Sequence, residues 1–114
     1  MTVFLDFLNQ YAATLSSDEK KSLSDYLTLL SKWNKAFNLT AIKKPKEMVI
    51  RHVADSLSII PFLSGDTILD VGSGAGFPGI VLAIVFPDKQ FTLLDSNGKK
   101  TQFLAQVRRD LSLK

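Results

Sequence analysis

The residues best suited to chemistry in this sequence lie in one short stretch of an acid and alternating glycines. Asp70 lies in a short apolar run, and Gly72, Gly74 and Gly76 follow at every second position. The apolar segment 80–86 comes next, so the expected order is strand, tight loop and helix. Glycine is needed in such a loop because a side chain would keep the backbone away from a docked ligand, at which the N–H groups of the next helix point. The pattern predicts a site for a nucleotide-like cofactor.

Two cofactor patterns can be read from these glycines. Gly74, Gly76 and Gly79 match the dinucleotide pattern G-x-G-x-x-G, which is a weak signal when it stands alone. Asp70, Gly72 and the two glycines that follow match acid-x-G-x-G-x-G, the pattern of S-adenosylmethionine-dependent methyltransferases. A carboxylate would repel a pyrophosphate, whereas it would attract the sulfonium and ammonium groups of S-adenosylmethionine. Asp70 therefore favours S-adenosylmethionine, and a nicotinamide dinucleotide is the alternative.

The composition excludes several classes of site. The 114 residues include no cysteine, which excludes disulfides and thiolate metal ligands, and a single histidine, which argues against a zinc site. No apolar run approaches the length of a membrane span, and no basic residue precedes Lys20, as a secretory signal would require. We expect a monomeric cytoplasmic protein with no membrane or metal partner.

Basic residues gather in two stretches. Between 32 and 51, six basic residues accompany one acid, and between 96 and 114 five accompany Asp110. The formal net charge of the chain is only +3, so the remainder is acidic. Such asymmetry is typical of proteins that bind a polyanion, most often a phosphate backbone. Two solvated helix faces are the alternative interpretation.

Apolar residues at helical spacing predict three helices before residue 62. The first spans 2–15, and Ser16 with Glu19 forms a capping box that begins the second. Pro45 suits the first position of the third helix, which Pro61 ends. We expect the following side chains to face one core: Phe4, Phe7, Leu8, Tyr11 and Leu15, then Leu23, Tyr26, Leu27, Leu30, Trp33 and Phe37, then Met48, Val49, Val53, Leu57 and Ile60.

The rest of the sequence alternates between strand and helix. Strands at 67–71 and 90–95 flank a helix at 78–86, and Ser96 or Asn97 caps a last helix. This βαβα order predicts a parallel sheet. The apolar residues of the last helix are Phe103, Leu104, Val107 and Leu111.

These elements predict an α/β chain in two parts. Residues 1–62 would form an N-terminal helical region that packs on the core, and residues 63–114 would open a Rossmann-like domain. A doubly wound sheet needs about five or more strands, so two strands leave its edges and helix faces uncovered. We therefore expect the 114 residues to be the N-terminal part of a longer protein.

Several polar residues outside the glycine-rich stretch are candidates for the site. Asp95 ends the second strand, where an acid accepts hydrogen bonds from ribose hydroxyls of either cofactor; a helix N-cap is the alternative role. On the third helix, Arg51 and Asp55 are four positions apart, as are His52 and Ser56. An ion pair beside a partly buried histidine is one interpretation of this spacing, and a polar mouth of the cofactor pocket is the other.

The loop expected at 38–42 offers two further candidates. Asn38 and Thr40 could hydrogen-bond a base edge or cap the following turn. Trp33 and Phe37, just before the loop, are interpreted as core residues and not as base-stacking residues.

Several segments together resemble a known family. The segments are 32–35 with 38–42, Arg51-His52 with 55–57, 68–79, and 92–96 with 98–100 and 103–104. In this order they resemble the bacterial 16S ribosomal RNA (guanine-N7) methyltransferases, called RsmG or GidB (glucose-inhibited division protein B). The resemblance covers nearly the whole chain, and Asn-Leu-Thr-Ala-Ile and Arg-His-x-x-Asp-Ser are its most specific parts.

The resemblance implies a class I methyltransferase fold and methyl transfer from S-adenosylmethionine to guanine N7 of small-subunit rRNA. By motif match, Gly72 and Phe77 would touch the cofactor, Gly74 and Gly76 would shape the loop, and Asp95 would lie near the ribose. The family's C-terminal half carries the rest of the pocket, so we expect these residues alone to be inactive. The candidates for RNA contact are Lys35, Asn38, Thr40, Lys43, Lys44, Arg51, Lys99 and Lys100.

Guanine N7 already has a free lone pair, so methylation requires no general base, and no catalytic residue is assigned. Two other functions stay open: a nicotinamide-dependent oxidoreductase, against which Asp70 argues, and a non-enzymatic RNA-binding module with an empty glycine loop.

Overall fold

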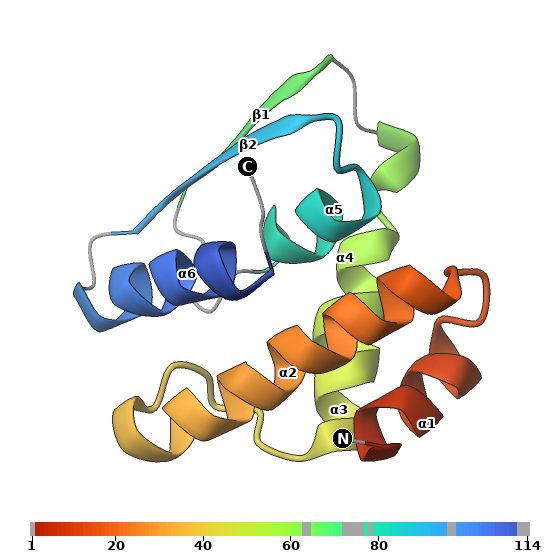
Figure 1. The fold of residues 1–114 in the computed structure, drawn as a ribbon, viewed down its shortest axis with the longest axis vertical. Helices are drawn as coiled ribbons and strands as arrows, with labels where there is room; N and C mark the ends of the chain where they lie inside the picture. Colours follow the sequence, from red (N-terminus) through yellow and green to blue (C-terminus); the bar gives the residue numbers. More distant parts are fainter. Residues whose placement is uncertain (1, 63–64, 72–76, 78, 96–97, 112–114) are drawn as a thin grey trace.

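The computed structural model describes residues 2–111 except 63–64, 72–76, 78 and 96–97. It has a mixed helix and strand architecture, as predicted, with the βαβα order in the second half of the chain (Figure 1). The elements are α1 (Thr2–Tyr11), α2 (Ser17–Phe37), α3 (Pro45–Glu47), η1 (Met48–Ala54), α4 (Asp55–Leu57), η2 (Ile60–Phe62), β1 (Thr67–Val71), α5 (Gly79–Val85), β2 (Gln90–Leu94) and α6 (Gly98–Asp110).

The long helix α2 begins at the predicted capping box. The backbone N–H of Ser16 donates to Glu19 Oε1 at 2.8 Å, and the N–H of Glu19 donates to Ser16 Oγ at 3.1 Å. These two bonds satisfy donors that a helix start leaves unpaired. The helix ends at Asn38, whose φ of 51° is left-handed and turns the chain into the loop at 38–42.

The core forms where α2 meets α1, η1, α5 and α6. Leu23, Tyr26, Leu27 and Leu30 of α2 are fully buried, as the helical stripe predicts. Phe37 is the exception: it is 41% exposed at the end of α2, so its assignment to the core is wrong. The other fully buried large side chains are Leu8, Met48, Val49, Val53, Val81, Leu82, Phe103 and Val107.

The predicted third helix begins at Pro45 but is not a continuous α-helix. Residues Met48–Ala54 form a π-helix, in which the backbone bonds run from i to i+5, and α-helical bonding resumes only at Asp55–Leu57. The α-helical part ends at Leu57, earlier than Ile60, and Pro61 lies in the short 3-10 turn η2. The uninterrupted helix over 45–60 is therefore wrong, since the apolar spacing cannot distinguish the two bonding patterns.

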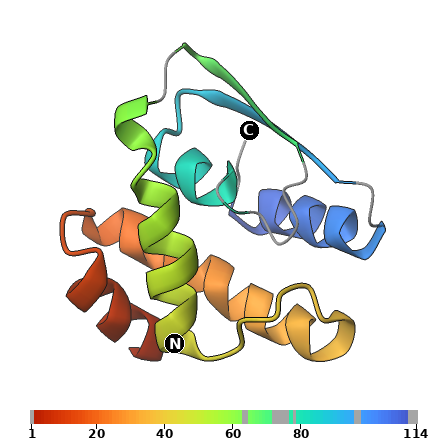
Figure 2. The same cartoon turned by 180° about the vertical axis from the view of Figure 1, so that it is seen from behind.

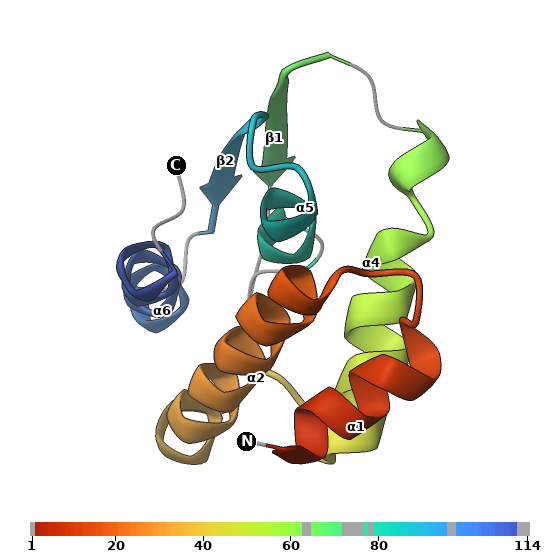
Figure 3. The same cartoon turned by 45° about the vertical axis from the view of Figure 1, so that its right-hand side comes forward.

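The two strands form a parallel sheet, as the βαβα order predicts. Val71 pairs with Leu94 and Ile68 with Phe91, and β2 ends one residue before the predicted Asp95. Figures 2 and 3 show α5 and α6 on one face of the sheet, between the strands and α2. On the other face Leu69 is 61% exposed, and no described element covers it. None of the described helices is both long and apolar enough to cross a membrane.

Candidate cofactor and RNA site

The carboxyl ends of the two paired strands lie side by side at one edge of the sheet. Because Val71 and Leu94 are paired, β1 and β2 end at the same edge of the sheet, and Asp95 directly follows the end of β2 there. The backbone oxygen of Asp95 accepts a hydrogen bond from Thr101 Oγ1 at 3.2 Å, which ties this end of β2 to α6. The side chain of Asp70, on β1, and the predicted residues Gly72, Gly74 and Gly76 lie outside the described residues.

Phe77, which directly follows the glycine-rich stretch, lies between two aromatic rings from the helical region. The ring of His52 stacks on it, with centroids 4.0 Å apart and planes inclined by 10°. The ring of Tyr26 approaches at 5.5 Å with a tilt of 54°, a common aromatic geometry. A predicted cofactor residue is thus held by η1 and α2.

His52 is itself anchored to the loop after α2. Its Nε2 shares a hydrogen bond of 3.2 Å with Thr40 Oγ1, and its backbone oxygen accepts a bond from Ser56 Oγ. Burial lowers the pKa of His52; the Asp55 carboxylate opposes this effect and the Arg51 guanidinium adds to it. These contacts favour a neutral imidazole near pH 7.

The loop is held in turn by a buried asparagine. The backbone N–H of Thr40 donates to Asn34 Oδ1 at 2.9 Å, and Asn34 is only 4% exposed on α2. The backbone N–H of Ile42 donates to Thr40 Oγ1 at 3.3 Å, so Thr40 caps the following turn, one of its two predicted roles. The sequence alone predicts no role for Asn34, because its position on the buried side of α2 gives no sign that its amide meets the loop.

The polar residues of the third helix surround a shallow pocket of about 240 Å³ beside Phe77. Arg51 and Asp55 are exposed, Ser56 is buried, and in the described part of the chain Arg51 and Asp55 form no ion pair with each other. The ion-pair interpretation is therefore wrong for this pair. The pocket is lined by Arg51, His52, Asp55, Ser56, Ile59 and Phe77.

A larger groove of about 740 Å³ runs between α1, α2 and the loop that follows α2. Three lysines, Lys32, Lys35 and Lys43, line it together with Asn38, and the exposed Lys44 follows Lys43. A groove with several ammonium groups can bind phosphates. Lys32 was not among the predicted RNA contacts, although its place in the basic stretch could have suggested it.

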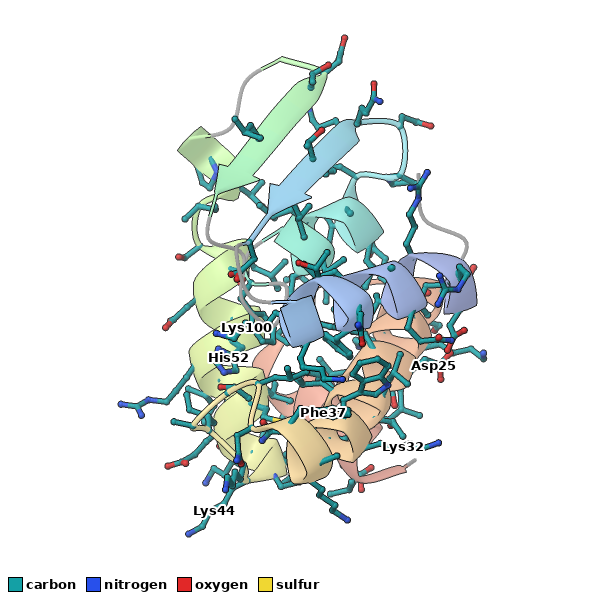
Figure 4. The ribbon with its side chains drawn as sticks, turned by 90° about the vertical axis from the view of Figure 1, so that its left-hand side faces the viewer. Asp25, Lys32, Phe37, Lys44, His52 and Lys100 are labelled. Atoms are coloured by element: carbon teal, nitrogen blue, oxygen red, sulfur yellow. The ribbon has the colours of Figure 1, made fainter. Side chains whose placement is uncertain are left out.

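The remaining predicted RNA contacts lie at the start of α6. Lys99 Nζ lies 4.7 Å from the centroid of the Phe37 ring, which brings this end of α6 to the carboxyl end of α2. Figure 4 shows Lys100, His52, Phe37 and Lys44 from this side of the molecule. The described residues contain no cluster of three or more His, Asp or Glu side chains that could hold a metal ion.

Comparison with known proteins matches residues 19–114 to the family described as rRNA small subunit methyltransferase G (GidB). A ribosomal RNA small subunit methyltransferase G from Pseudomonas aeruginosa is 58% identical over 106 residues, which are 92% of this chain and 50% of the relative. A relative of the same name from Ectopseudomonas mendocina is 61% identical over 101 residues, 87% of this chain and 47% of the relative.

A third relative of that name, from Alteromonas mediterranea, is 49% identical over 113 residues, 99% of this chain and 54% of the relative. The chain thus spans about half the length of the curated relatives that it matches. The family match covers well over half of the chain, and the identities are far above what chance similarity gives. The chain belongs to the GidB family, rRNA small subunit methyltransferase G.

Proposed function

We propose that this chain serves the S-adenosylmethionine-dependent methylation of guanine N7 in small-subunit (16S) ribosomal RNA. The observation that carries the proposal is the parallel pairing of β1 and β2, whose carboxyl ends precede the glycine-rich stretch and Asp95 in the sequence. Ligands of α/β proteins bind at the carboxyl ends of such strands. The names of the relatives, which are small subunit rRNA methyltransferases, support the same substrate.

In this proposal residues 63–114 open a Rossmann-like class I methyltransferase sheet, and residues 1–62 form a helical region that packs on it. The parallel pairing of β1 with β2 and the helices on one face support this division. The exposed face around Leu69 would be covered by further elements in proteins of the full family length. Such burial is expected because an apolar sheet face is stable only against another layer.

The cofactor-binding residues in this proposal are those of the glycine-rich stretch and the end of β2. S-adenosylmethionine, when bound, supplies the methyl group. Asp70 would attract its positive charge, and Asp95 would accept hydrogen bonds from its ribose. Gly72 and Phe77 would contact it, and Gly74 and Gly76 would let the backbone approach it.

Guanine N7 carries a free lone pair, so this chain need not remove a proton before methyl transfer. Its task is to hold the reacting groups in line and to exclude water, and rigid side chains at the site serve that task. The placement of Phe77 between His52 and Tyr26 supports such rigidity. No residue of the chain is assigned as a general base.

The RNA would be held by the basic groove and by the start of α6. Lys35, Asn38 and Lys43 line the groove, Lys99 approaches the carboxyl end of α2 from α6, and Lys100 follows it on α6. Ammonium groups bind the phosphate backbone without regard to sequence, and the affinity then falls with salt. Lys44, Arg51 and Thr40 complete the proposed contact surface.

The test is a calorimetric titration of S-adenosylhomocysteine, with NADH as the control. It uses this chain and an extended chain, in which residues 1–114 are followed by the C-terminal half of the Pseudomonas aeruginosa relative. We expect the extended chain to bind S-adenosylhomocysteine and not NADH. Binding of NADH alone would instead favour a nicotinamide-dependent oxidoreductase.

A variant of the extended chain separates the cofactor from the RNA. Gly74→Asp places a side chain and a charge where the backbone must approach the ligand, so it should abolish S-adenosylhomocysteine binding. RNA affinity should stay within about twofold, because the basic groove is unchanged. Equal cofactor affinity in this variant would contradict the proposal. If the extended chain binds RNA but neither S-adenosylhomocysteine nor NADH, a non-enzymatic RNA-binding module is favoured.

A further inference from the structure

We propose that Asn34, Thr40 and His52 form a positioning relay that fixes the orientation of Phe77 next to the glycine-rich loop and thereby sets the affinity for the cofactor. The inference rests on the proposed function, which makes Phe77 a cofactor contact. None of the three relay residues lies in the glycine-rich stretch, so each would act through Phe77. They are positioning residues and not catalytic ones.

The last contact of the relay restricts the Phe77 ring. A face-to-face stack with centroids at 4.0 Å and planes within 10° covers one side of that ring with His52. Tyr26, which is fully buried, approaches the same ring at 5.5 Å. Two neighbouring rings leave few rotamers open to Phe77, and the residue that follows Gly76 is thus tied to the helical region.

The middle contact fixes the imidazole. His52 lies in the π-helical segment, and its Nε2 reaches Thr40 Oγ1 at 3.2 Å. The hydroxyl is a small, directional partner that holds the plane of the imidazole. Without this bond the ring would keep its contact with Phe77 but lose its fixed plane.

The first contact anchors the relay in the core. Asn34 is buried on α2 and accepts the backbone N–H of Thr40 at 2.9 Å. Its backbone oxygen accepts the N–H of Asn38, where the helix ends in a left-handed turn. The loop therefore returns to the helix from which it departs, and Thr40 is held at two points, by its N–H and by its hydroxyl.

The relay is tested by the affinity of the extended chain for S-adenosylhomocysteine. Thr40→Val keeps the shape but removes the hydroxyl, which bonds both His52 Nε2 and the Ile42 N–H. We expect binding to weaken about fivefold, the effect of the one net hydrogen bond that reaches His52. Thr40→Ser should restore it. His52→Phe keeps an aromatic ring but loses the bond, so it should also weaken binding about fivefold. Thr28→Val is the matched control, because the Thr28 hydroxyl donates to Ser24 O within α2 and not to the loop or to His52.

The double variant distinguishes a relay from two separate effects. If Thr40 acts through His52, combining Thr40→Val with His52→Phe should weaken binding no more than either change alone. A product of the two effects, about 25-fold, would contradict the relay. So would unchanged affinity in Thr40→Val when circular dichroism shows that the variant is folded.

A second readout is independent of the cofactor. His52 is the single histidine of the 114 residues, so its imidazole protons are identified without ambiguity in the NMR spectrum of the 114-residue chain. The Phe77 ring should shift them upfield; Thr40→Val should change that shift, and Thr28→Val should not. Unchanged histidine signals in Thr40→Val would overturn the relay even if the parent binds cofactor. If Thr40→Val alters the histidine signals but the parent binds no S-adenosylhomocysteine, the proposed function is overturned, and with it the cofactor role of the relay.

Discussion

At the scale of single residues, the site depends on contacts between parts of the chain that are distant in sequence. His52 and Phe77 are 25 positions apart, yet their rings stack at 4.0 Å. The sequence placed His52 at the mouth of a cofactor pocket as one of two interpretations, and that interpretation stays a prediction; the other expected a partly buried histidine, and His52 is half-buried against Phe77. The half-buried imidazole also makes stability depend on pH.

The pH prediction concerns the extended chain and its His52→Phe variant. Burial lowers the pKa of His52 in the folded state below its ordinary value of 6.5, with Asp55 opposing and Arg51 adding to the shift. Below that value the unfolded chain takes up the proton more readily, so stability falls as the pH drops from 6.5 toward the folded-state pKa. Above pH 6.5 this group contributes no pH dependence.

Urea unfolding at pH 7.5 and pH 5.5 measures the effect. The parent should lose more stability between these values than His52→Phe does, because the other titrating groups are shared by both proteins. Equal losses in the two proteins would show that the imidazole is solvated equally in the folded and unfolded states.

At the scale of elements, local signals predict where helices begin better than how they continue. The capping box at Ser16 depends on residues three positions apart, and both of its hydrogen bonds form. The π-helix at Met48–Ala54 depends on what surrounds the helix, and the apolar spacing of Met48, Val49 and Val53 is compatible with either bonding pattern. The predicted helix type was therefore wrong there, although its start and its buried face were right.

The cap gives a stability prediction. Ser16→Ala removes the acceptor for the Glu19 N–H and should cost about 1 kcal/mol of unfolding free energy. Ser17→Ala is the matched control, since Ser17 is the first helical residue and not the cap, and it should change stability by about 0.5 kcal/mol or less. Chemical denaturation measures the unfolding free energy of both variants. Equal losses of stability in the two would mean that the cap contributes nothing.

At the scale of the whole molecule, a groove lined by lysines suggests where RNA binds, and an exposed sheet face suggests where further elements of the fold would pack. Lys32, Lys35 and Lys43 come from separate turns of α2 and from the loop, but they line one groove. Leu69 lies on a sheet face that no described element covers. Each of these features gives a prediction.

Neutralising a groove lysine should weaken RNA binding equally for all sequences. Lys35→Gln and Lys43→Gln in the extended chain should each lower the slope of log affinity against log salt by about 1. Lys21→Gln is the control, because Lys21 pairs with Asp25 at 3.5 Å and lies about 20 Å from Lys35 along α2. Filter binding at several salt concentrations gives the slopes; an equal change in the control would contradict the groove as the RNA site.

The exposed sheet face tests the proposed Rossmann-like fold. Leu69→Thr should cost about 1–2 kcal/mol in the extended chain, where further elements would bury this side chain. In the chain of 114 residues the same change should have little effect, because Leu69 is 61% exposed. Thermal unfolding of the four proteins gives the comparison. No loss in the extended chain would mean that this face stays open.

The sequence by itself determined the local features: the capping box, the buried stripe of α2, the two strands, their parallel order and the family to which the chain belongs. The family was predicted from motifs spread along the chain. The other features depend on residues within a turn or two of one another, or on a connection rule that holds for most βαβ units. Asp95 could be predicted to lie at the end of the second strand, and it directly follows the last residue of β2.

Only the tertiary structure decided how Asn34, Thr40, His52 and Phe77 meet, that Phe37 is left outside the core, and that Arg51 and Asp55 form no ion pair. These outcomes depend on packing between α2, the loop and η1, where the relative placement of elements, and not residue type or spacing, sets the distance between side chains. A buried amide such as Asn34 is stabilised by a partner six residues away only once the loop has turned back upon the helix.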